Sequence, residues 1–315
     1  MATTCKEKLM YPLLDLHCDT LYALHTNPLA GNLFANTLHV DIARMKKGGP
    51  VTSCFAIFID TEESFSPWKD ACDLHSLFRA SLEANTDHIR QVCTTEELVQ
   101  NSLVGAMLTC EDAQILEGDL TRLEILKAWG VVMASLTWNH ENDLGYPHTM
   151  ADKPLKALGI EAVSEMERLG IVVDVSHLSD AGFFSVAEHA RKPFVASHSN
   201  SRGCTPVSRN LSDEMLRILG DAGGVAGLNF CPSFLSSDRK KNHISDMVRH
   251  AKHMHDKGGS GILAIGTDFD GIAGELAIED IAGMERLWDA LVQAGFTNSA
   301  LEGMWQKNAL RVFGA

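Results

Sequence analysis

Six side chains that could bind a metal ion or transfer a proton stand at the ends of short apolar runs in this sequence of 315 residues. They are His17, Asp19, Glu111, His177, His198 and Asp268. Imidazole and carboxylate groups together form a ligand set that suits Zn²⁺ or a similar divalent ion. Taken singly, each residue is as well explained as a polar pair, a loop acid or a core histidine. All six together are difficult to explain without a metal, because a buried charge needs a partner.

The apolar runs are predicted to be strands, and the amphipathic segments between them are predicted to be helices. Near-continuous apolar character is typical of parallel strands that are covered on both faces. The eight predicted strands are Leu13–Asp19, Thr52–Ile59, Gly105–Cys110, Val131–Thr137, Ile171–His177, Pro193–His198, Gly224–Phe230 and Ile262–Asp268. Ser179 and Ser212 are predicted N-caps, and the last predicted helix covers Ser299–Phe313.

A strand followed by a helix, eight times over, predicts an α/β fold, the (β/α)₈ TIM barrel of the metal-dependent hydrolase type. Residues 1–315 are expected to form this barrel as a single catalytic domain, because no linker-like stretch divides them. An open doubly wound sheet is disfavoured, since the first strand ends in His17-Cys18-Asp19 and lacks a glycine-rich phosphate loop.

A TIM barrel places the carboxyl ends of its strands at one rim, where the active sites of this fold lie. His17 and Asp19 are two residues apart, so both are expected to face the barrel mouth while Cys18 faces the helices. The pattern suggests two metal ions, one beside His17 and Asp19 and one beside His177 and His198, with Glu111 between them. Two ions about 3.5–4 Å apart would activate a shared water and polarise a carbonyl, which is chemistry for hydrolysing an amide or ester.

Several residues near this rim are candidates for contact with a substrate. Asp268 could hold the activated water and carry its proton to the leaving amine, or pair with a substrate ammonium. Arg209, in the loop after the sixth strand, could bind a substrate carboxylate with two nitrogens, or be a surface charge. Trp138 could form the floor of a pocket in which His140 and Asn142 contact substrate. A core tryptophan with two solvated polar side chains is the alternative.

Net charge, cysteine content and the lack of long apolar runs indicate which partners and which cellular compartment to expect. The net charge of −14 argues against nucleic acid and against an anionic membrane surface as partners. The eight cysteines are scattered with no C-x-x-C pair, so disulfides are not expected. No apolar stretch of signal-peptide length follows residues 1–12, and no run is long enough to span a membrane, so a cytoplasmic soluble protein is expected.

Seven segments carry a resemblance to a known family: Asp15-Leu-His-Cys-Asp19, Glu111, Val173-Asp-Val-Ser-His177, Ser197-His-Ser199, Ser208-Arg-Asn210, Gly266-Thr-Asp-Phe-Asp-Gly271 and Asn308-Ala-Leu-Arg-Val-Phe313. In these segments the sequence resembles the renal (membrane) dipeptidase family, zinc peptidases of family M19 with amidohydrolase-like barrels. The resemblance implies a metallodipeptidase that cuts dipeptides with a hydroxide bridging two Zn²⁺ ions.

The resemblance also implies roles for individual residues. It implies that His17 and Asp19 hold one zinc, that His177 and His198 hold the other, and that Glu111 bridges them. Arg209 corresponds to the arginine that binds the substrate carboxylate. Asp268 corresponds to the aspartate that transfers a proton and binds the substrate amine.

One position departs from the family pattern. Trp138 follows Leu136-Thr137 where the mammalian enzymes have a histidine, and His140 is the candidate replacement. The expected partner is a small dipeptide substrate, and the resemblance suggests a homodimer. The alternatives are a related barrel amidohydrolase that acts on another amide or lactone, and a catalytically silent metal-binding barrel.

Overall fold

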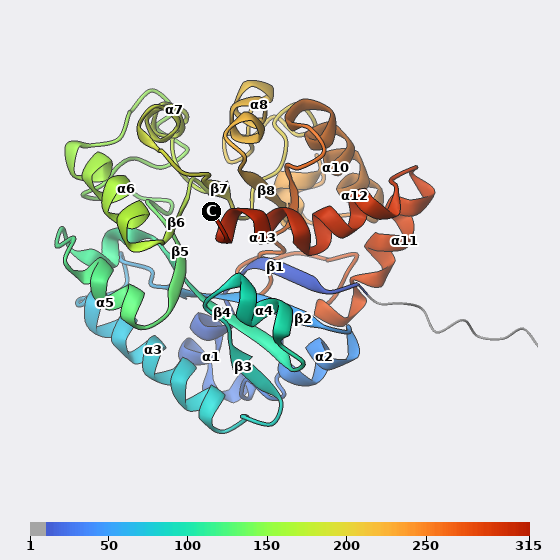
Figure 1. The fold of residues 1–315 in the computed structure, drawn as a ribbon, viewed down its shortest axis with the longest axis horizontal. Helices are drawn as coiled ribbons and strands as arrows, with labels where there is room; N and C mark the ends of the chain where they lie inside the picture. Colours follow the sequence, from blue (N-terminus) through green and yellow to red (C-terminus); the bar gives the residue numbers. More distant parts are fainter. Residues whose placement is uncertain (1–10) are drawn as a thin grey trace, which may run out of the picture.

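The eight apolar runs form the eight strands of a closed parallel barrel (Figure 1). The computed structural model describes residues 11–315. The barrel strands are β1 (Leu13–Cys18), β2 (Val51–Phe58), β4 (Val104–Glu111), β5 (Val131–Ser135), β6 (Val172–Asp174), β7 (Val195–Ala196), β8 (Val225–Leu228) and β9 (Leu263–Ile265). The ring closes because β1 pairs with both β2 and β9, and β2 pairs with β4. The predicted TIM barrel is therefore confirmed.

Helices surround the ring of strands, as Figure 1 shows. Their bounds are α1 (Thr20–Thr26), α2 (Ile42–Lys47), α3 (Pro67–Glu83), α4 (Thr95–Gln100), α5 (Arg122–Ala128), α6 (Ala157–Leu169), α7 (Asp180–His189), α8 (Asp213–Asp221), α9 (Pro232–Leu235), α10 (Ile244–Gly258), α11 (Glu285–Gln293), α12 (Asn298–Glu302) and α13 (Asn308–Phe313). Both predicted N-caps are confirmed: Ser179 Oγ accepts from Gly182 N at 3.0 Å and Ser212 Oγ accepts from Met215 N at 3.2 Å.

The structure contains elements that the sequence did not predict. β3 (Ile89–Gln91) pairs with the first residues of β4 and lies outside the closed ring. Helices α1, α2, α4 and α9 were also not predicted, and the longest of them has only 7 residues, too few to show a clear helical period. The helix predicted over Ser299–Phe313 is divided, because a π-helical turn at Gly303–Lys307 separates α12 from α13.

The buried apolar side chains form two clusters. The larger one fills the space between the strands and the surrounding helices. The smaller one joins Leu14, Cys54, Met107 and Ala264, which come from strands around the ring and can meet only inside the barrel. It continues to Val312 of α13, which crosses the middle of the ring in Figure 1. This cluster closes the end of the barrel where the strands begin.

Two further features of the described residues concern apolar helices and cysteines. No helix in residues 11–315 is long and apolar enough to cross a membrane. The seven cysteines of this part of the chain are all free thiols. Cys5 and most of the N-terminal segment in which no signal peptide was expected lie outside the described residues.

Candidate metal centre

The carboxyl ends of five barrel strands bring the six predicted polar residues together. Two come from the end of β1, one from the end of β4, and one each from the loops after β6, β7 and β9: His17, Asp19, Glu111, His177, His198 and Asp268. All six are buried, with at most 8 % of any of them exposed. The placement at strand ends is therefore as expected from the barrel, and the roles of the residues depend on their geometry.

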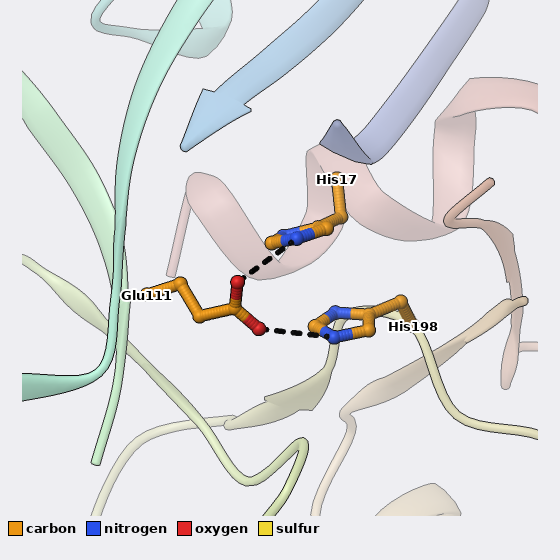
Figure 2. Close-up of side chains that lie close together, drawn as sticks. All are labelled: His17, Glu111 and His198. Carbon is orange, nitrogen blue, oxygen red and sulfur yellow. Dashed lines mark ion pairs between the residues drawn. The ribbon is translucent and has the colours of Figure 1, made fainter. Parts of the chain in front are cut away.

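Glu111 lies between two groups of ligand atoms. Its Oε2 is 3.4 Å from His17 Nε2, which is in turn 3.3 Å from Asp19 Oδ2. Its Oε1 is 3.0 Å from His177 Nε2 and 3.4 Å from His198 Nε2. Figure 2 shows the carboxylate between the rings of His17 and His198. One carboxylate thus presents a separate oxygen to each group.

The hydrogen bonds of the two histidines after β6 and β7 leave both Nε2 atoms without a proton. His177 Nδ1 donates to Asn139 Oδ1 at 2.9 Å, so its Nε2 carries a lone pair. Ser197 Oγ donates to Asp174 and therefore accepts from His198 Nδ1 at 2.7 Å. The two Nε2 atoms lie only 3.0 Å apart. Two lone pairs at this distance repel unless a cation lies beside them.

Other atoms of the cluster also need a cation. His17 Nε2 and Asp19 Oδ1 are buried and have no hydrogen-bond partner. Ligand atoms of His17, Glu111 and His198 all lie within 4.8 Å of one another, as do those of His17, Asp19 and Asp268. Buried polar atoms in native proteins are nearly always satisfied, so these donors fit a divalent metal ion.

The protonation behaviour of the histidines suits metal binding. Burial lowers the pKa of His177 and of His198 well below the usual value, which keeps both rings neutral as metal ligands must be. Burial also opposes a proton on His17, but the carboxylates of Glu111 and Asp19 outweigh it and raise the pKa of His17. The cluster therefore attracts positive charge beside Glu111, as a proton or as a metal ion.

Backbone strain accompanies the ligand cluster. His177 and Asp268 have φ angles of 69° and 63°, in the left-handed region that residues other than glycine rarely adopt. Gly271, three residues after Asp268, is also constrained, because a Cβ atom at this position would lie 2.0 Å from Asp19 Oδ2. Strained residues of this kind concentrate at functional sites, where the surrounding structure holds them in place.

Asp268 stands beside the cluster with one oxygen fixed. Asn229 Nδ2 donates to Asp268 Oδ2 at 2.7 Å and to the carbonyl of His198 at 3.0 Å. Burial raises the pKa of Asp268. Sequence reasoning missed Asn229, although it directly follows β8 and so obeys the same strand-end rule that selected the ligands.

Arg209 is buried with part of its guanidinium unpaired. Nη1 donates to Ser199 Oγ at 2.7 Å, whereas Nε and Nη2 are buried and have no hydrogen-bond partner. The guanidinium carbon lies 5.6 Å from the centre of the Phe234 ring, which lines the cavity above the cluster. Arg209 is therefore not a surface charge, and its two free donors suit a carboxylate.

A cavity of about 300 Å³ opens over the cluster. Trp138 lines it, but His140 does not: His140 Nδ1 lies 3.3 Å from Glu62 Oε1 and the ring packs 5.5 Å from Trp138. Asn142 is buried and donates to Asp112 Oδ1 and to the carbonyl of Leu136, so it holds the loop and does not face the cavity. The substrate contacts predicted for Trp138 and His140 stay predictions.

Comparison with known proteins finds dipeptidases both by sequence and by structure. A family model described as membrane dipeptidase (peptidase family M19) matches residues 7–315. An uncharacterized dipeptidase of Schizosaccharomyces pombe is 28% identical over an aligned length of 332 residues, which covers 96% of this chain and 79% of that protein.

Two solved structures are similar over nearly the whole chain. A metallopeptidase of Rhodobacter sphaeroides, liganded with a phosphinate mimic of the dipeptide L-Ala-D-Ala, is 26% identical with a TM-score of 0.90, and the match covers 96% of this chain and 99% of that one. Dipeptidase AC, a metallopeptidase of family M19, is 27% identical with a TM-score of 0.90, and the match covers 97% of this chain and 100% of that one.

Proposed function

The chain belongs to the membrane dipeptidase family, peptidase family M19, and we propose that it hydrolyses dipeptides at a centre that holds two zinc ions. The observation that carries this proposal is the position of Glu111. Its two carboxylate oxygens face different ligand groups, His17 on one side and His177 with His198 on the other. A single shared carboxylate between two sets of donors is the arrangement that two neighbouring ions require.

The ligands would divide between the two ions in the same way. His17 and Asp19 would hold the first ion, and His177 and His198 would hold the second. Asn139 and Ser197 support this assignment, because they occupy Nδ1 of His177 and of His198 and so direct Nε2 toward the centre. When bound, two zinc ions would polarise the scissile carbonyl and activate water as a nucleophile near neutral pH.

Asp268 would move the proton that hydrolysis requires. Its Oδ2 is held by Asn229, which leaves Oδ1 for the reaction. A carboxylate whose pKa is raised by burial accepts a proton at neutral pH more readily than an exposed one, and Asp268 would return that proton to the departing amine. The alternative contact of Asp268, with the substrate ammonium, uses the same oxygen.

Arg209 would restrict the enzyme to short substrates. A carboxylate that pairs with its free Nε and Nη2 must lie close to the cluster, and only a chain of about two residues has a carboxyl terminus so near its scissile bond. The relative from Rhodobacter sphaeroides was solved with a dipeptide mimic, which supports this substrate class. Trp138 would contact the substrate from the wall of the cavity, with His140 behind it.

The test uses zinc-loaded protein, with bound metal quantified, on L-Ala-L-Ala, L-Ala-D-Ala, N-acetyl-L-Ala-L-Ala and L-Ala-L-Ala amide. We expect about two zinc ions per chain and hydrolysis of free dipeptides. The amide lacks the carboxylate and should be cut about 10- to 100-fold less efficiently, since a hydrogen bond to a charged group is worth about 1.5–3 kcal/mol. Arg209→Ala should remove this difference mainly through KM. Zinc-loaded protein that cuts none of the free dipeptides would overturn the proposal.

A further inference from the structure

One wall of the cavity over the cluster consists of three aromatic side chains. Tyr22 of α1 and Phe58 at the end of β2 lie with ring centres 5.0 Å apart, and Phe58 and Trp138 with ring centres 4.9 Å apart. All three line the cavity, and we name them the aromatic wall. Phe58 is buried, whereas Tyr22 and Trp138 are partly exposed. The wall thus presents a continuous apolar surface to a bound ligand.

The aromatic wall and the loop that carries Arg209 come from opposite sides of the barrel mouth. Around the ring the strands follow the order β1, β2, β4, β5, β6, β7, β8, β9. The wall comes from the segments at β1, β2 and β5, whereas Arg209 follows β7 and its neighbour Phe234 belongs to α9 after β8. In a ring of eight strands, β2 stands opposite β7. The ligand cluster takes residues from both halves and lies between the two sides.

This placement determines which part of a dipeptide meets the wall. A carboxylate on Arg209 places the carboxyl-terminal residue on the β7 and β8 side, with the peptide bond over the cluster. The amino-terminal residue then extends toward β1 and β2. Its ammonium has acidic neighbours there, since Asp19 and Asp268 also line the cavity. Its side chain is left facing the aromatic wall.

Given the dipeptidase reaction proposed above, on which this inference rests, we propose that the aromatic wall selects dipeptides whose amino-terminal side chain is aromatic or large and apolar. A methyl side chain would leave the wall in contact with water, whereas a phenyl ring buries its apolar area and packs against the rings. A difference of this size is worth about tenfold or more in kcat/KM.

The experiment compares L-Phe-L-Ala with L-Ala-L-Phe, which have the same atoms in reversed order, and uses L-Ala-L-Ala as the reference. Zinc-loaded wild-type protein should cut Phe-Ala with a kcat/KM about tenfold or more above that of Ala-Ala, and Ala-Phe without this gain. Trp138→Ala should lower kcat/KM for Phe-Ala about tenfold more than for Ala-Ala, and Trp138→Phe should restore most of the preference. Phe58→Leu is a second variant that tests the wall with a smaller change in volume.

The control is Phe65→Ala. Phe65 lies in the β2–α3 loop, which begins directly after Phe58, but is fully exposed to solvent, so all three rates should stay as in wild type. A preference for Ala-Phe over Phe-Ala, or equal losses on Phe-Ala and Ala-Ala in both wall variants, would overturn the inference and leave the dipeptidase function intact. Failure of the zinc-loaded protein to cut any of the three dipeptides would overturn the proposed function and this inference with it.

Discussion

The two ends of the barrel are built from opposite kinds of side chain. At the carboxyl ends of the strands, imidazoles and carboxylates are buried, and several of their atoms have no protein partner. At the amino ends, the interior cluster continues into α4 and α13 through Leu98, Ala309 and Val312, which are all apolar. Burying unpaired polar atoms costs stability, whereas burying apolar side chains supplies it. The first end therefore provides the reactive groups, and the second end provides apolar packing that stabilises the fold.

Mutations at the two ends should therefore have different effects. We call the end with the ligand cluster and its cavity the open end, and the end covered by α13 the closed end. A substitution at the open end should change metal binding and catalysis more than the stability of the metal-free fold. A substitution at the closed end should do the reverse, because it removes packing without touching the ligands. A TIM barrel allows this separation, since its active site and its opposite end share few residues.

The largest expected effect is that of Glu111→Gln at the open end. The amide cannot serve as a shared anionic ligand, so bound zinc should fall below two per chain and kcat/KM should fall by about 10³-fold or more. The metal-free variant should be at least as stable as metal-free wild type, because burial raises the pKa of Glu111 and so disfavours its charged form in the folded chain, whereas the amide carries no charge. Metal analysis, dipeptide assays and thermal melts in a chelator measure the three quantities.

Glu63→Gln is the matched control for this variant. Glu63 lies in the β2–α3 loop and is exposed, so metal content and activity should be unchanged. Retention of two zinc ions by Glu111→Gln would contradict the shared-ligand role. A large loss of stability in the metal-free variant would contradict the view that the buried polar groups of the ligand cluster destabilise the metal-free fold.

Val312→Ala at the closed end should give the opposite result. Val312 is 3 % exposed and packs in the interior cluster, so its truncation should lower the free energy of unfolding by about 2 kcal/mol. Zinc content and kcat/KM per folded molecule should stay at the wild-type level. Val99→Ala is the control, because Val99 of the nearby α4 is 71 % exposed and its truncation should cost little. Equal denaturation midpoints for the two variants would show that the packing of α13 against the barrel interior does not stabilise the fold.

The fold was predictable because apolar runs and strand ends are local features of the sequence. All eight barrel strands were found, since strands covered on both faces are apolar at nearly every position. A change of pairing register within β1 was not visible. Leu14 and Leu16 point into the barrel, so alternation counted from them would place Cys18 there as well, opposite to the orientation expected from the spacing of His17 and Asp19. The pairing of β1 with β2 shifts between Asp15 and Cys18, so Cys18 packs in the outer core and His17 reaches the cluster.

The site was predictable only as far as strand ends determine it. The candidate ligands follow from the rule that carboxyl ends of barrel strands meet at one rim. The partners of the ligands do not, because Asn139 and Ser197 act through loop and side-chain geometry that no spacing encodes. Tyr22 and Phe58 were missed for a different reason: aromatic residues in apolar surroundings look like core residues in a sequence.

Ser197→Ala tests whether the open end depends on partners behind the ligands. Without the hydroxyl, His198 Nδ1 loses its acceptor and the ring can carry its proton on Nε2, which blocks a metal bond. Zinc affinity, measured by competition with a chelating dye, should fall about 10- to 100-fold. Ser53→Ala is the control, because Ser53 Oγ is also buried but has no hydrogen-bond partner. An unchanged zinc affinity in Ser197→Ala would show that zinc binding depends on the ligands themselves and not on the hydrogen bond from His198 to Ser197.

The smallest expected effect concerns His250 of α10, a buried histidine that contacts the loop of Arg209 through Ser201. Its Nδ1 accepts from Ser201 N at 3.1 Å and its Nε2 donates to the carbonyl of Leu235 at 3.0 Å, so the neutral ring is fully paired. Burial lowers the pKa of His250 to about 4.

The lowered pKa of His250 predicts a dependence of stability on pH with a definite sign. In the unfolded chain, histidine binds a proton near pH 6.5 whereas the folded chain does not, so stability falls as the pH drops below about 6.5 toward 4. The loss from this residue should be about 1 kcal/mol between pH 6.5 and pH 5.5. Denaturant unfolding of metal-free protein at both pH values should show a loss about 1 kcal/mol smaller in His250→Gln than in wild type and in the exposed control His25→Gln, because the lowered pKa values of His177 and His198 add the same further loss to all three proteins. The same dependence of stability on pH in all three proteins would show that His250 contributes nothing to it, and that the loss comes from other groups such as the ligand histidines.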